Sequence, residues 1–581
     1  MADVVALLQL DPTVGDVAGN VRLIEAAGRI AAEAGATLAI TSELAVSGYP
    51  PRDLLLDPKF IEACAEATFG INTELPMIVG TPLPPAGDRQ RPANGAVRVV
   101  PGRRSKVATR KQLLPTYDVF DEGRYFEGDS SPGILRLTEH LSLGVTICED
   151  AWQHAGLVPS DYTADPIDQL AAWGHDGEAL SLSINLSSSP FHLHKEGSRA
   201  DVVRAAAKTL QHPFLLCNQV GGNDDLLFDG RSVAAWPDGG VVQAPAWQQG
   251  ILLVDLEDPS NCSFLPLTTD GLRKGNAIDV LFVSADEKPS PARSDADLLE
   301  AVSLGLRDYC RKSGISQIVL GMSGGIDSAV SAAVACRAIG AENVLGLSMP
   351  SRHSSAHSVE DAMASARALG INLDTIEINE LHDAADSALA HELEEGNPVA
   401  AENLQARLRG MLVMGVANAR GAMVIATGNK SELAMGYCTL YGDMCGGYAP
   451  LGDLYKTEVY ALAEAINAEA KQSGESAPIN DSTLTKPPSG ELAPGQMDED
   501  LLPPYAVLDA ILVARIERGL DAESIARTTA AETDTIAWVL ARLGANEHKR
   551  WQMPPAPRVS IRAFGQGWRQ PLAARKDGYR K

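Results

Sequence analysis

The sequence predicts a two-part α/β protein in which each part is built on its own layered sheet. In the first half, β-branched and leucine-rich segments alternate with segments of amphipathic helical spacing. In the second half, helical segments separate consecutive apolar runs, which is the pattern of a parallel sheet. Between the halves, residues 284–294 are polar, contain prolines and lack apolar periodicity. We therefore expect domains at residues 1–283 and 295–581, joined by a linker at residues 284–294.

The first half opens on a buried strand and continues in alternation. Residues 4–10 form an apolar run, and residues 20–34 place their apolar side chains at helical spacing. Later segments repeat both patterns. The expected strands are residues 4–10, 37–41, 77–80, 141–147, 179–184 and 213–217, and the expected helices are residues 20–34 and 198–210.

The second half carries the stronger sheet pattern. A helix over residues 296–312 leads into the apolar strand 316–320, and the alanine-rich residues 329–335 continue as a helix. Strands that alternate with helices form parallel crossovers, so we expect a doubly wound parallel sheet whose ligand lies at the carboxyl ends of the strands. The remaining expected strands are residues 344–348, 374–378 and 423–427.

The composition narrows the classes of function. The chain has 581 residues, of which 75 are acidic and 49 basic, giving a formal charge of −26. Such a surface repels phosphate backbones and argues against a nucleic-acid partner. The chain start lacks the features of a signal peptide, and no apolar run is long enough to span a bilayer. The eight cysteines form no C-x-x-C pair, so we expect a reduced, cytoplasmic protein without a zinc site or a disulfide framework.

A glycine-rich turn is the most informative local feature. Residues 321–328 read Gly-Met-Ser-Gly-Gly-Ile-Asp-Ser between a strand and a helix. Unpaired amides at a helix start and the positive end of the helix dipole favour a bound phosphate. The loop lacks the Walker pattern and resembles the signature of the ATP pyrophosphatase superfamily, which cleaves ATP to AMP and pyrophosphate. The resemblance implies that Asp327 helps to hold Mg²⁺ and that ATP contacts Gly321, Ser323, Gly324, Gly325, Asp327 and Ser328.

Three reactive residues in the first half lie just past strand-like segments. They are Glu43, Lys111 and Cys148, and the segments 43–50, 111–117, 119–126 and 148–152 belong to the same pattern. Together they resemble the Glu-Lys-Cys triad of the nitrilase, or carbon-nitrogen hydrolase, superfamily. The resemblance implies an α-β-β-α sandwich for residues 1–283. For family glutaminases it also implies glutamine contacts, at Tyr117, Ser189 and Lys195.

The chemistry of amide hydrolysis needs these residue types. An amide carbonyl is a poor electrophile, so a thiolate must form and the developing oxyanion must be stabilised. Glu43 can take the thiol proton as a general base, and Lys111 can stabilise the thiolate and the oxyanion. The nitrogen then leaves as ammonia and a thioester remains.

The second half carries an ordered series of further motifs. They include residues 402–407, 427–432, 441–451, 456–459 and 486–492. The series resembles the NAD synthetases across nearly the whole half. That resemblance implies ATP contacts at Thr427, Lys456 and Ser489, a magnesium site at Asp327 and Glu432, and deamido-NAD contacts at Asn403, Arg407, Glu432 and Lys549.

The implied reaction solves a chemical problem, because a carboxylate resists attack by ammonia. Transfer of AMP from ATP onto the nicotinate carboxylate supplies a leaving group, and ammonia then displaces AMP. Free ammonia is largely protonated at neutral pH, and ammonium has no lone pair with which to attack. We therefore infer a sheltered path for ammonia from Cys148 to the adenylate. The serine-rich residues 351–358 are either a lid over the nucleotide or a solvated loop.

The pairing of the two halves is typical of glutamine-dependent NAD synthetases. The resemblance implies a homo-oligomer that acts on glutamine, ATP and deamido-NAD with Mg²⁺. The alternatives are another glutamine amidotransferase of the ATP pyrophosphatase superfamily, a tRNA-modifying or RNA-binding protein with the same ATP loop, and a non-catalytic scaffold. The charge of −26 opposes the second, and the intact Glu43, Lys111 and Cys148 oppose the third.

Overall fold

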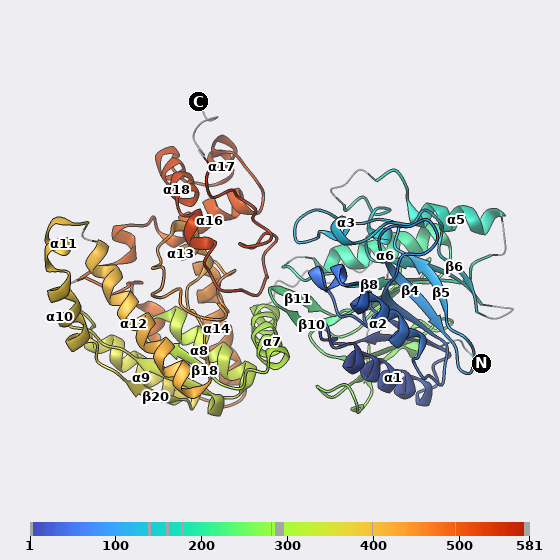
Figure 1. Ribbon diagram of the computed structural model, residues 1–581, viewed down its shortest axis with the longest axis horizontal. Coiled ribbons are helices and arrows are strands. Elements are labelled where there is room, and N and C mark those ends of the chain that lie inside the picture. The colour runs from blue at the N-terminus through green and yellow to red at the C-terminus, as the bar shows by residue number, and fades with distance from the viewer. Residues whose placement is uncertain are drawn as a thin grey trace. The chain divides into compact units, whose positions relative to one another are not determined.

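The computed structural model describes residues 4–137, 141–158, 162–176, 179–193, 195–280, 282–284, 295–397, 399–493 and 495–574 (Figure 1). The chain divides between residues 292 and 293 into two compact units. The predicted linker at residues 284–294 lies outside the described residues except for Ser284. The units are therefore described one at a time.

The first unit contains two large sheets and a short hairpin. In spatial order, the eight-stranded sheet is β16 (Ile278–Asp279), β15 (Ser263–Pro266), β14 (Gly250–Asp255), β1 (Val4–Gln9), β2 (Leu38–Thr41), β3 (Met77–Leu83), β4 (Ala93–Val99) and β5 (Lys106–Arg110). The seven-stranded sheet is β17 (Phe282–Val283), β13 (Val241–Gln243), β12 (Val233–Ala235), β9 (Phe214–Asn218), β8 (Leu182–Ser187), β7 (Ser142–Ile147) and β6 (Ile134–Arg136). The hairpin is β10 (Val220–Asn223) with β11 (Leu226–Asp229).

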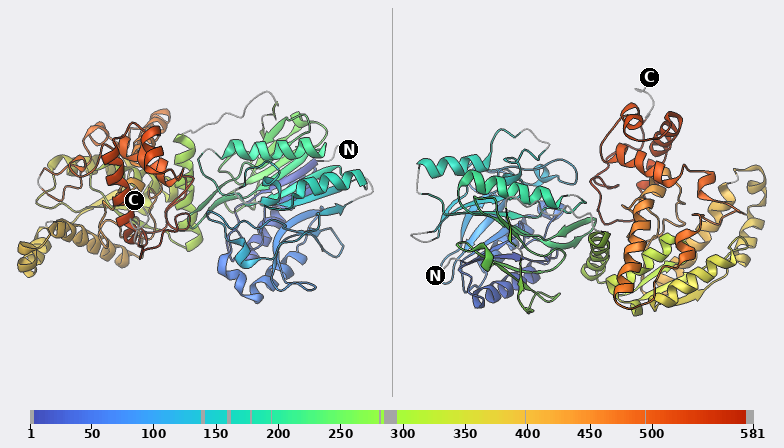
Figure 2. Two further views of the ribbon diagram at one scale, coloured as in Figure 1. Left: turned by 90° about the horizontal axis from the view of Figure 1, so that it is seen from above. Right: turned by 180° about the vertical axis from the view of Figure 1, so that it is seen from behind.

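Helices cover the outer faces of this pair of sheets (Figure 2). They are α1 (Val17–Glu33) and α2 (Pro58–Phe69) on one sheet, and α5 (Pro166–Asp176) and α6 (Glu196–Leu210) on the other. The unit also contains two short helices, α3 (Glu122–Tyr125) and α4 (Glu149–Trp152). Alternate strand residues such as Leu7 and Ile184 fill the core between the sheets. Their neighbours face outward, where Leu8 packs with Ile24 of α1 and Leu216 packs with Val203 of α6. The predicted α-β-β-α sandwich is confirmed.

The second unit contains one parallel four-stranded sheet. Its spatial order is β20 (Asn372–Thr375), β19 (Val344–Ser348), β18 (Ile318–Gly321) and β21 (Met423–Val424). All three strand pairs are parallel, which confirms the predicted doubly wound sheet. The chain order reverses between β18 and β21, so their carboxyl ends form the crevice where such sheets bind ligands.

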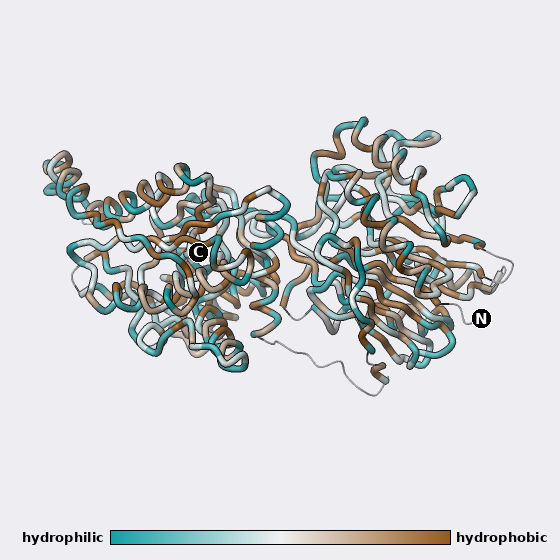
Figure 3. Tube along the Cα trace, turned by 90° about the horizontal axis from the view of Figure 1, so that it is seen from below, coloured by the Kyte–Doolittle hydropathy of each residue, from teal (hydrophilic) through white to brown (hydrophobic). Residues whose placement is uncertain are grey.

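Helices surround this sheet and form a second apolar cluster beyond it. They are α7 (Asp295–Ser313), α8 (Ile326–Ile339), α9 (Ala356–Leu369), α10 (Asn379–Ala388), α11 (Ala390–Glu395), α12 (Val399–Arg420), α13 (Lys430–Met435), α14 (Lys456–Gln472), α15 (Asp481–Thr485), α16 (Tyr505–Ile516), α17 (Ala522–Thr528), α18 (Thr533–Ala545) and α19 (Glu547–Arg550). Val413 and Ala417 of α12 pack on Val319, Leu347 and Val424 of the sheet. Helices α13, α16 and α18 share the cluster beyond the sheet. Figure 3 shows the hydropathy along the chain, with hydrophobic segments in brown.

Some predicted strand boundaries differ from the structure. The strand expected at residues 423–427 ends at Val424; Ile425 still donates its N–H to the Val319 carbonyl of β18 at 3.1 Å, and it also forms an isolated bridge with Tyr448. The strand expected at residues 374–378 spans Asn372–Thr375, whose side chains are mostly exposed and therefore carry little apolar signal. Among the described residues, no helix is both long and apolar enough to cross a bilayer.

Candidate active sites

The three predicted catalytic residues of the first unit converge inside the sandwich. Glu43 follows β2, Lys111 follows β5, and Cys148 lies between β7 and α4. All three are buried. Lys111 Nζ lies 2.7 Å from Glu43 Oε1, and its charge interacts with Cys148. The structure therefore places a base, a cation and a thiol in one enclosed site.

A fourth buried group, Glu122, completes this cluster. It lies on α3 and binds Lys111 Nζ through both carboxylate oxygens, each at 2.8 Å. Burial and the nearby Glu43 raise the pKa of Glu122 to about 7, and Lys111 opposes that shift. Sequence reasoning missed Glu122, although it lies in a segment, residues 119–126, that matches the carbon-nitrogen hydrolase pattern.

Hydrogen bonds fix the orientation of the Glu43 carboxylate. The Asn94 side-chain amide donates to Glu43 Oε1 at 2.7 Å, and the Ser188 backbone N–H donates to Glu43 Oε2 at 3.1 Å. Each carboxylate oxygen therefore has a defined donor. Glu43 keeps one geometry for accepting a proton.

Cys148 has the backbone of a tight strand-to-helix turn and a protonated thiol. Its φ of 45° lies in the left-handed region, which a non-glycine residue adopts at a cost of roughly 1–3 kcal/mol. Burial raises the pKa of the Cys148 thiol well above its ordinary value, Glu43 raises it further, and Lys111 opposes the shift. The Cys148 thiol of the free protein is therefore protonated. It needs a base at the moment of attack.

The three predicted glutamine contacts lie around this cluster. The Tyr117 hydroxyl donates to Glu149, the residue after Cys148, at 3.0 Å. Ser189 Oγ is buried and has no hydrogen-bond partner in the described part of the chain. Lys195 Nζ donates to the Pro190 carbonyl at 2.8 Å and lies 5.3 Å from the ring centre of Trp152 on α4. Their contact with glutamine stays a prediction.

The second unit holds a cavity of about 450 Å³ at the carboxyl ends of β18 and β21. Its lining includes most of the residues that the motifs predicted: Gly321, Ser323, Gly325, Asp327, Ser328, Asn403, Thr427, Glu432, Lys456, Ser489 and Lys549. Gly324 and Arg407 are not in the lining of this cavity. The cavity lies at the reversal of strand order, as expected for a ligand of a doubly wound sheet.

The glycine loop has the geometry that its sequence predicts. Gly325 precedes α8, and Ser323 Oγ accepts a hydrogen bond from the Gly325 N–H at 3.2 Å. Gly324 has a φ of 80°, and a Cβ on it would lie 2.1 Å from the Ser358 carbonyl oxygen. Only glycine fits at that position. The loop packs against α9 there and leaves the first turn of α8 open to the cavity.

Two carboxylates meet one buried lysine on the cavity wall. Lys456 Nζ pairs with Asp327 Oδ2 and lies 3.5 Å from Glu432 Oε1. The Asn429 side-chain amide donates to Asp327 Oδ1 at 2.8 Å. Burial and the charge of Asp327 raise the pKa of Glu432 to about 8, against the effect of Lys456. One lysine therefore compensates the two acids only in part, and oxygen donors of this kind fit a hard divalent cation.

Helix α12 presents a different arginine to the cavity from the one predicted. Glu402, Ala406, Arg409 and Val413 line it, and their spacing places them on one side of the helix. Arg407 is exposed, and its Nε donates to the Leu440 carbonyl at 3.2 Å. The predicted contact of Arg407 with substrate stays a prediction that this geometry does not favour. The sequence motif did not indicate Arg409, because it does not show which side of the helix faces the cavity.

The serine-rich residues 351–358 reach across the glycine loop. Ser355 Oγ and Ser358 Oγ both donate to Glu491 Oε1, at 2.9 and 2.7 Å. Ser354, Ser358, Ser489 and Glu491 all line the cavity. These bonds tie the segment to the wall that carries Ser489, which favours the lid interpretation.

Comparison with known proteins matches both units to families. The carbon-nitrogen hydrolase model matches residues 4–260, and the NAD synthase model matches residues 298–554. Glutamine-dependent NAD(+) synthetases from Synechocystis sp. and Rhodobacter capsulatus are each 40% identical to this chain, with 98% of both chains covered. The solved structure of the glutamine-dependent NAD+ synthetase from Acinetobacter baumannii in complex with ADP is 32% identical, with a TM-score of 0.71 and 98% of both chains covered.

The chain belongs to the glutamine-dependent NAD(+) synthetase family. It is therefore an enzyme whose two halves resemble a carbon-nitrogen hydrolase and an NAD synthase. Membership in the glutamine-dependent NAD(+) synthetase family confirms the resemblances that the motifs indicated. The two matched segments leave residues 261–297 between them, and the predicted linker lies within that interval.

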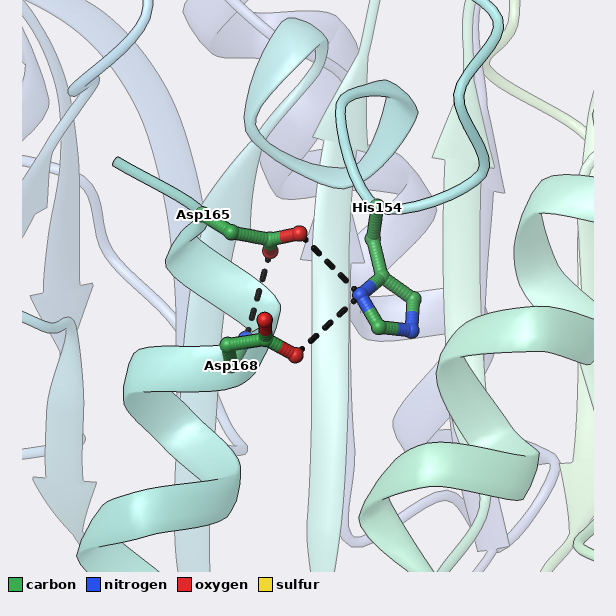
Figure 4. Close-up of side chains that lie close together, drawn as sticks. All are labelled: His154, Asp165 and Asp168. Atoms are coloured by element: carbon green, nitrogen blue, oxygen red, sulfur yellow. Dashed lines mark hydrogen bonds and ion pairs between the residues drawn. The ribbon is translucent and has the colours of Figure 1, made fainter. Parts of the chain in front are cut away.

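A further cluster of ligand-type side chains lies outside both sites (Figure 4). His154 Nδ1 lies 3.1 Å from Asp165 Oδ2 and 3.4 Å from Asp168 Oδ1. His154 Nε2 is 2.8 Å from Thr209 Oγ1 on α6, and Asp165 Oδ1 accepts the Ile167 and Asp168 N–H groups at the start of α5. Every member of the cluster has a protein partner. Through His154, the cluster connects the start of α5 to Thr209 of α6.

Proposed function

We propose that this protein makes NAD from deamido-NAD and ATP with nitrogen taken from glutamine. The observation that carries the proposal is the presence of two complete sites in one chain: a buried base, cation and thiol in one unit, and a nucleotide-sized cavity with a glycine loop in the other. The full-length similarity to glutamine-dependent NAD(+) synthetases supports the same pairing. We further propose that the chain acts as a homo-oligomer, as its family resemblance implies.

In the first unit, Cys148 Sγ attacks the side-chain carbonyl carbon of glutamine. Because the thiol of the free protein is protonated, Glu43 accepts its proton during the attack and then donates it to the departing nitrogen. Lys111 lies beside Glu43 and stabilises the oxyanion that forms on the substrate. Ammonia leaves, and water activated by Glu43 hydrolyses the thioester to glutamate.

In the second unit, the first turn of α8 and the glycine loop hold the phosphates of ATP. The nicotinate carboxylate of deamido-NAD attacks the α-phosphorus, pyrophosphate leaves, and ammonia then displaces AMP from the adenylate. Lys456 contributes positive charge where the pyrophosphate charge develops. Ser489 and Thr427 line the same cavity and are proposed ATP contacts, while Asn403 and Lys549 are proposed contacts of deamido-NAD.

Asp327 and Glu432 are the proposed holders of Mg²⁺. Both residues line the same cavity as the glycine loop. Burial and the nearby Asp327 raise the pKa of Glu432, so a bound cation would favour the ionised form of this carboxyl group. A bound Mg²⁺ would supply charge compensation for the phosphates of ATP. Asn429 fixes Asp327 in the orientation that this role needs.

The proposed activity is tested by supplying all four reactants. We expect the protein with ATP, Mg²⁺, glutamine and deamido-NAD to form NAD, AMP, pyrophosphate and glutamate, each detected by chromatography. Formation of ADP in place of AMP would exclude carboxylate adenylation. Glutamate formation without NAD would point to an amidotransferase with another acyl acceptor.

Substitution of Arg409 should weaken nucleotide binding. Arg409 lines the cavity with a guanidinium that can pair with phosphate or carboxylate oxygens. We expect Arg409→Ala to raise the KM of ATP or of deamido-NAD by about tenfold, the loss of roughly one charged contact of about 1.5 kcal/mol or more. Arg407→Ala on the same helix is the matched comparison, measured under the same conditions. A larger rise for Arg407→Ala would restore the original prediction and contradict the choice of Arg409.

A further inference from the structure

Asp150 lies two residues after Cys148 and belongs to no predicted catalytic role. Its side chain is buried on α4, and in the ionised form this carboxylate can only accept hydrogen bonds. Oδ1 accepts the backbone N–H groups of Gln112 at 3.1 Å and Leu113 at 2.9 Å, and Oδ2 accepts the Ile147 N–H at 3.0 Å. One carboxylate thus satisfies three backbone donors from two segments that are far apart in sequence.

The three backbone donors that Asp150 binds are next to two catalytic residues in the sequence. Gln112 and Leu113 directly follow Lys111, and Ile147 directly precedes Cys148. The other side of each catalytic residue is already held by the sheet, because the Lys111 N–H donates to the Asn94 carbonyl and the Cys148 N–H donates to the Leu186 carbonyl, both at 2.8 Å. Asp150 holds the side that the sheet leaves free.

We infer that Asp150 is a positioning residue for glutamine hydrolysis, which fixes Lys111 and Cys148 relative to each other. The inference rests on the proposed glutaminase activity of the first unit. Residues 111–116 have no regular secondary structure, so backbone ladders do not hold this segment past Lys111. Cys148 also needs support, because its left-handed backbone persists only where surrounding contacts enforce it.

Asparagine is the informative substitution at this position. It keeps the size of the side chain, but one carboxylate oxygen becomes an NH₂ group that faces a backbone N–H donor. Asp150→Asn therefore loses at least one of the two connections while filling the same volume. A displacement of about 1 Å in a catalytic group can cost about 10²-fold in rate.

Asp255 provides a matched control in the same unit. Its carboxylate also accepts three N–H groups of one loop, from Glu257, Asp258 and the Asn261 side chain, each at 3.0 Å. It is the last residue of β14, and among the described residues its carboxylate has no hydrogen bond to the segments that carry Lys111 or Cys148. Asp255→Asn therefore makes the same chemical change next to a loop that carries no proposed catalytic residue.

The experiment compares the two variants in the full-length protein by three measurements. We expect Asp150→Asn to lower the kcat of glutamine hydrolysis by about 10²-fold with the KM within about threefold, and to slow iodoacetamide alkylation of Cys148 by about tenfold, read by mass spectrometry. Ammonia-driven NAD synthesis should stay near wild type. Asp255→Asn should stay near wild type in all three.

Three results would overturn the inference: unchanged hydrolysis in Asp150→Asn, an equal loss in Asp255→Asn, or loss of ammonia-driven synthesis together with hydrolysis. Failure of the proposed function looks different, because wild type itself would then hydrolyse no glutamine. In that case the alkylation rate still decides, since it needs no turnover. An alkylation rate in Asp150→Asn equal to that of wild type would show that Asp150 does not position the thiol.

Discussion

Cys148→Ala will abolish glutamine-dependent NAD formation and spare synthesis from added ammonia. Alanine removes the sulfur that interacts with Glu43 and Lys111, so no thioester can form at this site. We expect glutamine-driven NAD to fall by at least about 10³-fold, because no group remains to replace a covalent nucleophile. The ammonia-driven rate should remain within about twofold, because the adenylation cavity lies in the other unit and loses no contact.

A matched cysteine separates this effect from a general loss of folding. Cys217 is buried in the same inter-sheet core as Cys148, and its thiol contacts the backbone carbonyls of Leu8 and Ile40 and the side chain of Ser232. Cys217→Ala removes the same atom from the same core, and both activities should persist. Loss of ammonia-driven synthesis in Cys148→Ala would contradict separate sites.

Asp327→Asn will stop NAD formation with either nitrogen source. The substitution keeps the size of the side chain but removes the charge that pairs with Lys456 and that would hold Mg²⁺. We expect a fall of about 10²-fold or more in NAD formation from both glutamine and ammonia, comparable to the loss of one group that stabilises a transition-state charge. Glutamine hydrolysis measured as glutamate release should continue, since Cys148 and its partners are unchanged.

Asp521→Asn is the control for this prediction. Asp521 precedes α17 in the same unit, and its side chain accepts the Ser524 N–H, a bond that asparagine also makes. Both activities should stay near wild type in that variant. If Asp327→Asn retained ammonia-driven synthesis, the glycine loop would not be the ATP site.

The sequence predicted the parts of the sites that local patterns encode. Glu43, Lys111 and Cys148 each follow a strand, and the glycine loop follows a strand and begins a helix, so their placement could be read from neighbouring residues. Glu122 could not be derived in this way. It lies on the four-residue helix α3, which is too short to show apolar periodicity, and its contact with Lys111 depends on the path of the irregular segment between them.

The distinction between Arg407 and Arg409 shows a second limit. Both lie on α12, and choosing between them requires knowing which side of the helix faces the sheet. Val413 and Ala417 pack on Val319 and so fix that rotation, a tertiary contact that no local pattern reports. Similarly, no local pattern reports that β21 ends at Val424 or that Ile425 forms a bridge with Tyr448.

The most direct test of the account follows the nitrogen atom. Wild-type protein is given [amide-¹⁵N]glutamine, ATP, Mg²⁺ and deamido-NAD in the presence of excess unlabelled ammonium, and the products are analysed by mass spectrometry. The account predicts ¹⁵N in the carboxamide of NAD, with one AMP formed for each NAD. NAD that carries mainly unlabelled nitrogen would contradict the sheltered path, and ADP in place of AMP would contradict the proposed reaction itself.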